Sequence, residues 1–126
     1  MISVLYVAAG GALGALSRWG LNLTASELTK GDFPYATFIA NIVGSFFMGI
    51  LVAYFLKNVT LSDELKLFLT VGFLGSFTTF STFSIDAVSL FTRGEILVAI
   101  TYIFASVILS IGAVMLGTYL VWKVPV

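Results

Sequence analysis

Charged residues divide this chain into four long apolar blocks. The blocks run from about Ile2 to Gly20, Tyr35 to Leu56, Leu67 to Phe91 and Ile96 to Trp122. A helix needs about 20 mostly apolar residues to cross the hydrocarbon core of a bilayer, and each block has this length. Lipid offers the backbone no hydrogen-bond partners, so each block is expected to be helical. The pattern predicts an all-α membrane protein with four transmembrane helices.

The composition agrees with a membrane protein and excludes several functions. Hydrophobic residues make up 60% of the chain and charged residues only 10%, whereas soluble domains carry about a quarter charged residues. The chain has no histidine or cysteine. It therefore lacks thiolate and imidazole metal ligands, and we expect it not to be an enzyme. Six basic residues balance six acidic ones, which argues against a nucleic-acid partner.

The chain shows no sign of more than one domain. No linker, low-complexity stretch or long repeat is visible, so residues 1–126 are expected to form a single transmembrane domain. No Lys or Arg precedes the first apolar block, unlike in a cleaved signal peptide, so this block is expected to be retained as a helix. An even number of spans places both termini on one side.

The basic residues do not specify one orientation in the membrane. Three fall on each side of the predicted helices: Lys57, Lys66 and Lys123 with the N-terminus, and Arg18, Lys30 and Arg93 opposite. An excess on one side normally sets the topology. Either Arg18 lies too deep to count, or copies insert both ways and pair as an antiparallel, dual-topology homodimer. We favour the dimer, because four short helices alone make a poor pore or carrier.

The third block is unusual for a helix that faces lipid. Between Thr70 and Ser84 it contains two glycines and a series of serines and threonines. Hydroxyl side chains bond to helix carbonyls and bend helices, and glycine tolerates non-helical angles. We predict that the third helix is broken near Gly75 to Thr79, where freed carbonyls can bind a cation. The alternative is a continuous helix whose hydroxyls are satisfied internally.

Polar side chains also form a stripe on the second block. Thr37, Asn41, Ser45 and Gly49 recur every fourth residue and so share one helix face. Small and polar residues of this kind often mediate helix packing, which is our interpretation of Ser45 and Gly49. For Asn41, packing and ion binding are both open, because its amide has two donors and an acceptor.

The fourth block carries a similar track of hydroxyls at Tyr102, Ser106 and Ser110. Hydrogen bonding between helices and a row of donors along a pore are both open. In the third block, phenylalanines occur at every third position from Phe77 to Phe83. Packing is their usual role, although the positive edge of an aromatic ring can also stabilise a partly dehydrated anion.

Other features indicate packing or location near the membrane surface. Gly10 and Gly14 form a G-x-x-x-G pair, which predicts close helix contact. Arg18 and Asp86 are placed near the ends of their spans, where long charged side chains can reach the interface. Lining the vestibule of a pore is the alternative for both.

Three motifs together indicate a family. They are GSFTTFSTFS at residues 75–84, GGALGALSRW at residues 10–19 and ANIVGS at residues 40–45. The chain resembles the Fluc (CrcB) family of fluoride channels in these motifs, in the order of the motifs and in the length of the chain. The resemblance implies an antiparallel homodimer in the cell inner (plasma) membrane, exporting fluoride passively through two pores.

The same resemblance assigns residues to the pore. It implies that the Asn41 amide contacts the ion and that Phe80 and Phe83 turn ring edges toward fluoride, each pore taking its pair from both chains. The further pore-lining hydroxyls that it implies are Thr37, Ser81, Thr82, Tyr102, Ser106 and Ser110.

The resemblance also implies a structural sodium ion on the dimer axis. Backbone carbonyls of Gly75 and Thr78 from both chains would hold it. Asp86 stands where the family often has Glu, which keeps the charge but shortens the reach of the side chain.

Two other functions remain as alternatives. A small multidrug-type transporter is also a four-helix, dual-topology dimer, but it needs an acidic residue deep in a span, which is not expected here. A non-transporting membrane anchor or assembly subunit would have no ion pathway and no need for Asn41 or the phenylalanines.

Overall fold

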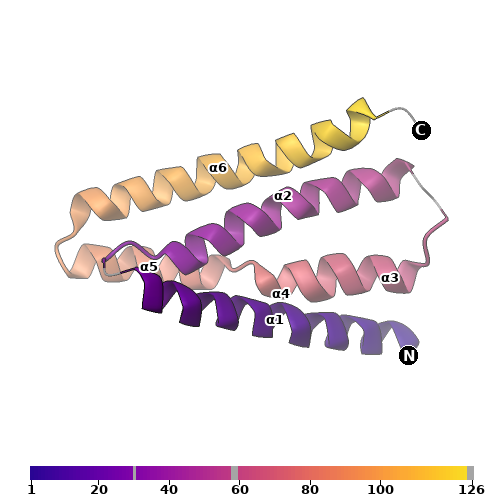
Figure 1. The fold of residues 1–126 in the computed structure, drawn as a ribbon, viewed down its shortest axis with the longest axis horizontal. Helices are drawn as coiled ribbons and strands as arrows, with labels where there is room; N and C mark the ends of the chain where they lie inside the picture. The colour runs from indigo at the N-terminus through magenta and orange to yellow at the C-terminus, as the bar shows by residue number, and fades with distance from the viewer. Residues whose placement is uncertain (30, 58–59, 125–126) are drawn as a thin grey trace.

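The computed structural model describes residues 1–29, 31–57 and 60–124, and these form a bundle of four helical spans (Figure 1). The first span is α1 (Ile2–Leu28), the second is α2 (Tyr35–Lys57) and the fourth is α6 (Ile96–Lys123). All four spans are long and apolar enough to cross a membrane. The start of α1 and the end of α6 lie at the same end of the bundle, as an even number of spans requires.

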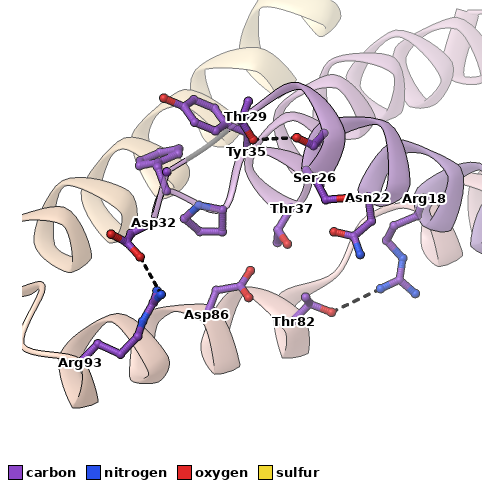
Figure 2. Close-up of a pocket in the computed structure, with 15 residues that line it drawn as sticks. Arg18, Asn22, Ser26, Thr29, Asp32, Tyr35, Thr37, Thr82, Asp86 and Arg93 are labelled. Atoms are coloured by element: carbon purple, nitrogen blue, oxygen red, sulfur yellow. Dashed lines mark hydrogen bonds and ion pairs between the residues drawn. The ribbon is translucent and has the colours of Figure 1, made fainter.

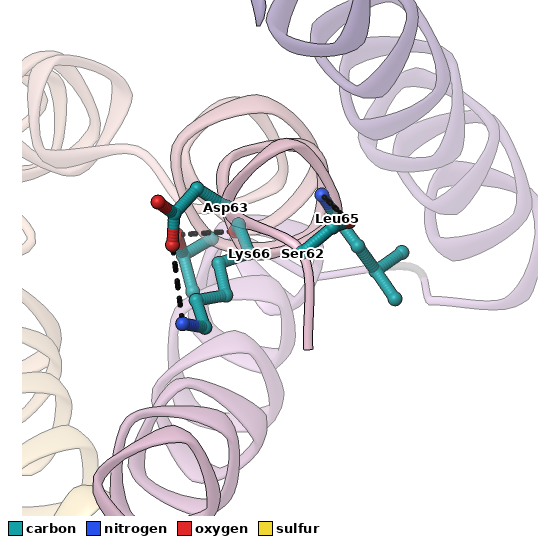
Figure 3. Close-up of polar contacts among 5 residues, drawn as sticks. Ser62, Asp63, Leu65 and Lys66 are labelled. Atoms are coloured by element: carbon teal, nitrogen blue, oxygen red, sulfur yellow. Dashed lines mark hydrogen bonds and ion pairs between the residues drawn. The ribbon is translucent and has the colours of Figure 1, made fainter. Parts of the chain in front are cut away.

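The third span consists of several helical pieces. It begins with α3 (Asp63–Leu67), continues as the wider π-helical segment η1 (Phe68–Leu74) and the short α4 (Gly75–Phe77), and resumes as α5 (Phe80–Thr92). At its start, the Ser62 hydroxyl accepts a hydrogen bond from the Leu65 amide at 3.3 Å (Figure 3). This side chain caps the helix N-terminus.

The helix breaks at Thr78 and Thr79, inside the predicted window. Their backbones are extended, with φ/ψ of −80°/155° at Thr78 and −156°/116° at Thr79. Gly75, by contrast, is helical at −61°/−31°, so glycine freedom does not cause the break. Hydroxyls stabilise the broken backbone: the Thr79 hydroxyl accepts from the Thr82 amide at 3.2 Å and caps α5, and the Thr78 hydroxyl bonds back to the Leu74 carbonyl at 2.9 Å.

Glycines hold α1 close to the third span. A Cβ added at Gly10 or Gly14 would collide with the backbone carbonyls of Phe68 or Phe73. Gly72 in η1 faces α1 in the same way, at Val7. The close contact predicted from the G-x-x-x-G pair is therefore confirmed, and the partner is the π-helical segment.

Glycines also hold α2 close to α6. A Cβ added at Gly49 would collide with the Val114 carbonyl, and one at Gly117 with the Phe46 carbonyl. The Thr118 hydroxyl donates to the Gly49 carbonyl at 3.4 Å. The packing role predicted for Gly49 is confirmed.

We expect Gly14→Ala to destabilise the protein by about 1–3 kcal/mol, because the added methyl must displace the backbone of η1. The matched control is Gly20→Ala in the same helix, where an added Cβ meets nothing within 4 Å. Unfolding in detergent, followed by circular dichroism, measures both. Equal stability of the two variants would contradict this account of the α1–η1 contact.

The end of the first helix differs from the sequence prediction. The first helix continues to Leu28, beyond the expected end near Gly20. Its extra turns are polar, and hydroxyls such as that of Thr24, which bonds to the Gly20 carbonyl at 3.0 Å, are satisfied within the helix. Arg18 therefore lies inside α1 and not at its end. Lys30, which the charge balance counts on the same side as Arg18, lies outside the described residues.

Much of the apolar surface of a single chain remains uncovered. The buried core is small, and one cluster within it consists of Phe83, Ala87, Leu90, Ala99 and Tyr102. Large apolar side chains on every span are exposed, including Leu16, Phe47, Ile85 and Phe104. Lipid or further protein must cover this surface.

Candidate functional site

Two cavities lie on either side of the break in the third span. The first, here called the break cavity, has a volume of about 410 Å³. Its walls come from α2, α4, the break, α5 and α6: Asn41, Ser45, Gly75, Thr78, Thr79, Phe80, Phe83, Ser106, Val107, Ser110 and Ile111. The structure thus brings together residues that the sequence had placed on three separate spans.

The Asn41 amide holds the break from the side of α2. Its Oδ1 accepts a hydrogen bond from the Thr79 amide at 2.7 Å, and its Nδ2 donates to the Thr79 carbonyl at 3.0 Å. Gly44, one turn along α2, makes room for this contact, because a Cβ there would collide with the Thr78 side chain. An amide carries two N–H donors, so one remains available for a ligand in the cavity.

Ser106 offers a second donor to the break cavity. Its side chain is buried, and its hydroxyl has no hydrogen-bond partner among the described residues. Buried polar groups in proteins are nearly always paired, so such a hydroxyl calls for a water or ligand. Ser110 lines the same cavity one turn further along α6.

The two phenylalanines of the break cavity differ in their surroundings. Phe83 is 8% exposed, whereas Phe80 is 77% exposed. Their ring centroids are 5.3 Å apart, with 42° between the ring planes. Phe83 belongs to the core of this chain, and Phe80 projects from α5 away from it.

Tyr102 contacts one lining residue of each cavity, Phe83 of the break cavity and Asp86 of a second cavity described below. It is completely buried, with its ring centroid 5.3 Å from that of Phe83. Its hydroxyl donates to the Asp86 carboxylate at 3.2 Å. The proton of this hydroxyl is therefore already engaged by an acid, unlike that of Ser106.

The second cavity, here called the outer cavity, has a volume of about 490 Å³ (Figure 2). It lies beyond the break, between the C-terminal half of α1, the start of α2 and α5. Its polar lining includes Arg18, Asn22, Thr37, Thr82, Asp86, Asp32 and Arg93. Arg93 and Asp32 form an ion pair at 2.8 Å, which joins the end of α5 to the α1–α2 connection.

Arg18 makes contacts that the sequence did not indicate. Its Nε donates to the Ser76 carbonyl at 3.1 Å and its Nη1 to the Thr82 hydroxyl at 3.3 Å. Asp86 lies in α5, near the end of the third span as expected, and lines the same cavity. The vestibule location considered for both residues agrees with this placement.

The remaining predicted hydroxyls are divided between the cavities and the surface. Thr37 is buried at the wall of the outer cavity, and Thr82 lies across from it. Ser81 is exposed outside both cavities, with its hydroxyl 3.3 Å from that of Thr79. Sequence reasoning missed Thr79 as the N-cap of α5, although a threonine directly before a helical run is a known signal.

The break also frees backbone oxygens. In a continuous helix the Thr79 amide would bond to the Gly75 carbonyl, but here it bonds to Asn41. Gly75 and Thr78 both line the break cavity. No cluster of acidic side chains suited to a metal occurs among the described residues, so a cation at this place would depend on carbonyl oxygens.

Discontinuous membrane helices that line a polar cavity are found in membrane transport proteins that bind ions near the break. Residues 5–118 match the family described as CrcB-like protein, Camphor Resistance (CrcB). The chain belongs to this family, which confirms the resemblance, and it is a multi-pass membrane protein.

Similar proteins align with this chain over nearly its whole length. A protein of Agrobacterium fabrum is 46% identical over 117 residues, covering 93% of this chain and 94% of its own. Proteins of Dehalococcoides mccartyi and Granulibacter bethesdensis are 44% and 43% identical, over 95% and 96% of this chain and 92% and 95% of their own. All three bear the name "Fluoride-specific ion channel FluC".

Proposed function

We propose that this chain forms a passive channel selective for fluoride and is not an enzyme. The observation that carries the proposal is the break cavity, where Asn41, Ser106 and Ser110 gather beside the rings of Phe80 and Phe83. The names of the similar proteins support fluoride as the ion.

The chemistry of the break cavity suits a small, strongly hydrated anion. Such an ion enters a narrow pore only if protein donors replace its water. Ser106 has an unused hydroxyl and Asn41 an unused N–H, and both are neutral. Neutral donors bind an anion without trapping it as a fixed positive charge would. The lining contains no acid or base, which favours passive conduction over proton coupling.

A second copy of the chain is part of the proposal. Phe80 is exposed and the break cavity is open on one side, so one chain does not enclose the ion. The equal division of basic residues between the two sides supports an antiparallel homodimer in the cell inner (plasma) membrane. Two copies related by a twofold axis would form two pores, each with phenylalanines from both chains.

A structural sodium ion on that axis is consistent with the break. Carbonyl oxygens are ligands for hard cations, and the helical partner of the Gly75 carbonyl is diverted to Asn41. Gly75 and Thr78 of two chains would supply four such oxygens. The ion would hold the broken helices together and add a positive field near the pores.

The test is ion flux from liposomes. We expect the purified protein to release fluoride, but not chloride, down its gradient. Equal release of both ions, or of neither, would refute the proposal. Flux coupled to a proton gradient would favour the transporter alternative, and a complete absence of flux would favour the anchor or assembly subunit.

A further inference from the structure

Arg18 is a charged residue within a membrane span that the proposed ion pathway does not explain. It lies in the C-terminal half of α1 and lines the outer cavity. Neither ion pair found among the described residues involves Arg18. A charged group at such a position is expensive to bury and usually has a functional reason.

The contacts of Arg18 span the break in the third helix. Ser76, whose carbonyl accepts from Nε, belongs to α4 before the break. Thr82, whose hydroxyl accepts from Nη1, belongs to α5 after it. The planar guanidinium presents its donors in a fixed fork that reaches both groups. A lysine ammonium can also bond to two acceptors, as Lys57 does, but it lies on a flexible stem and sets no fixed geometry between them.

The contact with Thr82 also determines what that hydroxyl can do. The Thr82 oxygen accepts from Arg18 at 3.3 Å and from the Thr79 hydroxyl at 3.0 Å. A hydroxyl oxygen has two lone pairs, and both are then used. The proton of Thr82 remains free to donate, and Thr82 lines the outer cavity.

We propose that Arg18 is a positioning residue that fastens the two halves of the third span across the break and sets Thr82 as a hydrogen-bond donor to the passing anion. This inference rests on the proposed fluoride conduction. Asn41 holds Thr79 from α2, and Arg18 holds Ser76 and Thr82 from α1. The break is thus fixed from both sides by side chains of its own chain.

The experiment compares Arg18→Lys, which keeps the charge, with Arg18→Gln, which removes it. Lys66→Gln is the control for loss of one positive charge, because Lys66 pairs with Asp63 in α3, far from both cavities. Fluoride efflux from liposomes and amide hydrogen exchange of residues 76–82 are measured for each. We expect both Arg18→Lys and Arg18→Gln to reduce fluoride flux by about tenfold or more. We also expect both variants to speed amide exchange of residues 76–82 by about tenfold or more. Lys66→Gln should change neither.

A role in attracting anions through charge alone predicts a different pattern. Arg18→Lys would then conduct like the wild type, and the loss in Arg18→Gln would disappear at high ionic strength. Either result, or unchanged exchange in both variants, overturns the proposal. A smaller effect of Arg18→Lys on flux in a Thr82→Val background would support it. If the wild type conducts no fluoride, the proposed function fails, while the exchange measurement still decides whether Arg18 fastens the break.

Discussion

Replacing Asn41 with alanine is expected to abolish most fluoride flux and to destabilise the protein. The change removes both hydrogen bonds to Thr79, at 2.7 and 3.0 Å, and leaves its amide and carbonyl without these partners. Each unpaired buried group costs about 1–3 kcal/mol. The change also removes the amide donor that faces the cavity. A hydrogen bond to a charged group contributes about 1.5–3 kcal/mol, and a barrier raised by about 3 kcal/mol lowers flux about a hundredfold.

Asn41→Asp separates the two functions of the amide, which are to hold the Thr79 backbone and to donate a hydrogen bond to the ion. The carboxylate keeps an acceptor for the Thr79 amide but loses the donors and adds a negative charge to an anion path. We expect flux to fall as in Asn41→Ala, with a smaller loss of stability. Liposome efflux and unfolding in detergent measure the two effects. Val43→Ala, an exposed position on the same helix, is the control. Wild-type flux in Asn41→Ala would refute the role given to this residue.

The sequence predicted the spans well because their signal is local. Apolar length alone identifies four helices, and hydroxyls near Gly75 to Thr79 indicated a break. The exact place of the break was harder to predict from the sequence, because it depends on Asn41. This residue is distant in sequence and bonds to the Thr79 backbone. The π-helical segment was not predicted at all, since nothing in FLTVGFL distinguishes it from an α-helix.

The site was predicted in part, and mainly through resemblance to a family. Spacing along α6 grouped Tyr102, Ser106 and Ser110, but the structure separates them. Ser106 and Ser110 line the break cavity, while the Tyr102 hydroxyl bonds to Asp86. Periodicity tells which residues share a helix face, whereas the partner of each side chain depends on the neighbouring helix. The hydrogen bonds of Arg18 were not predicted for the same reason, because its two acceptors lie on another span.

Phe80→Ile and Phe83→Ile are both expected to reduce fluoride flux by about tenfold or more, because an aliphatic side chain lacks the positive ring edge. Their effects on stability should differ. Phe83 is 8% exposed and packs on Tyr102, so its loss leaves a gap that costs about 1–3 kcal/mol. Phe80 is 77% exposed in one chain, so its replacement should cost less than about 0.5 kcal/mol there.

The contrast between the two phenylalanines tests whether the pore needs a second chain. Flux and detergent unfolding are measured for both variants, with Phe104→Ile as the control, since Phe104 is exposed on α6 outside both cavities. A side chain that one chain leaves exposed can affect conduction strongly only if something else closes the pore around it. Loss of flux in Phe80→Ile with unchanged stability of the single chain would therefore support a pore completed by a partner copy. Normal flux in both variants would refute the role given to the rings.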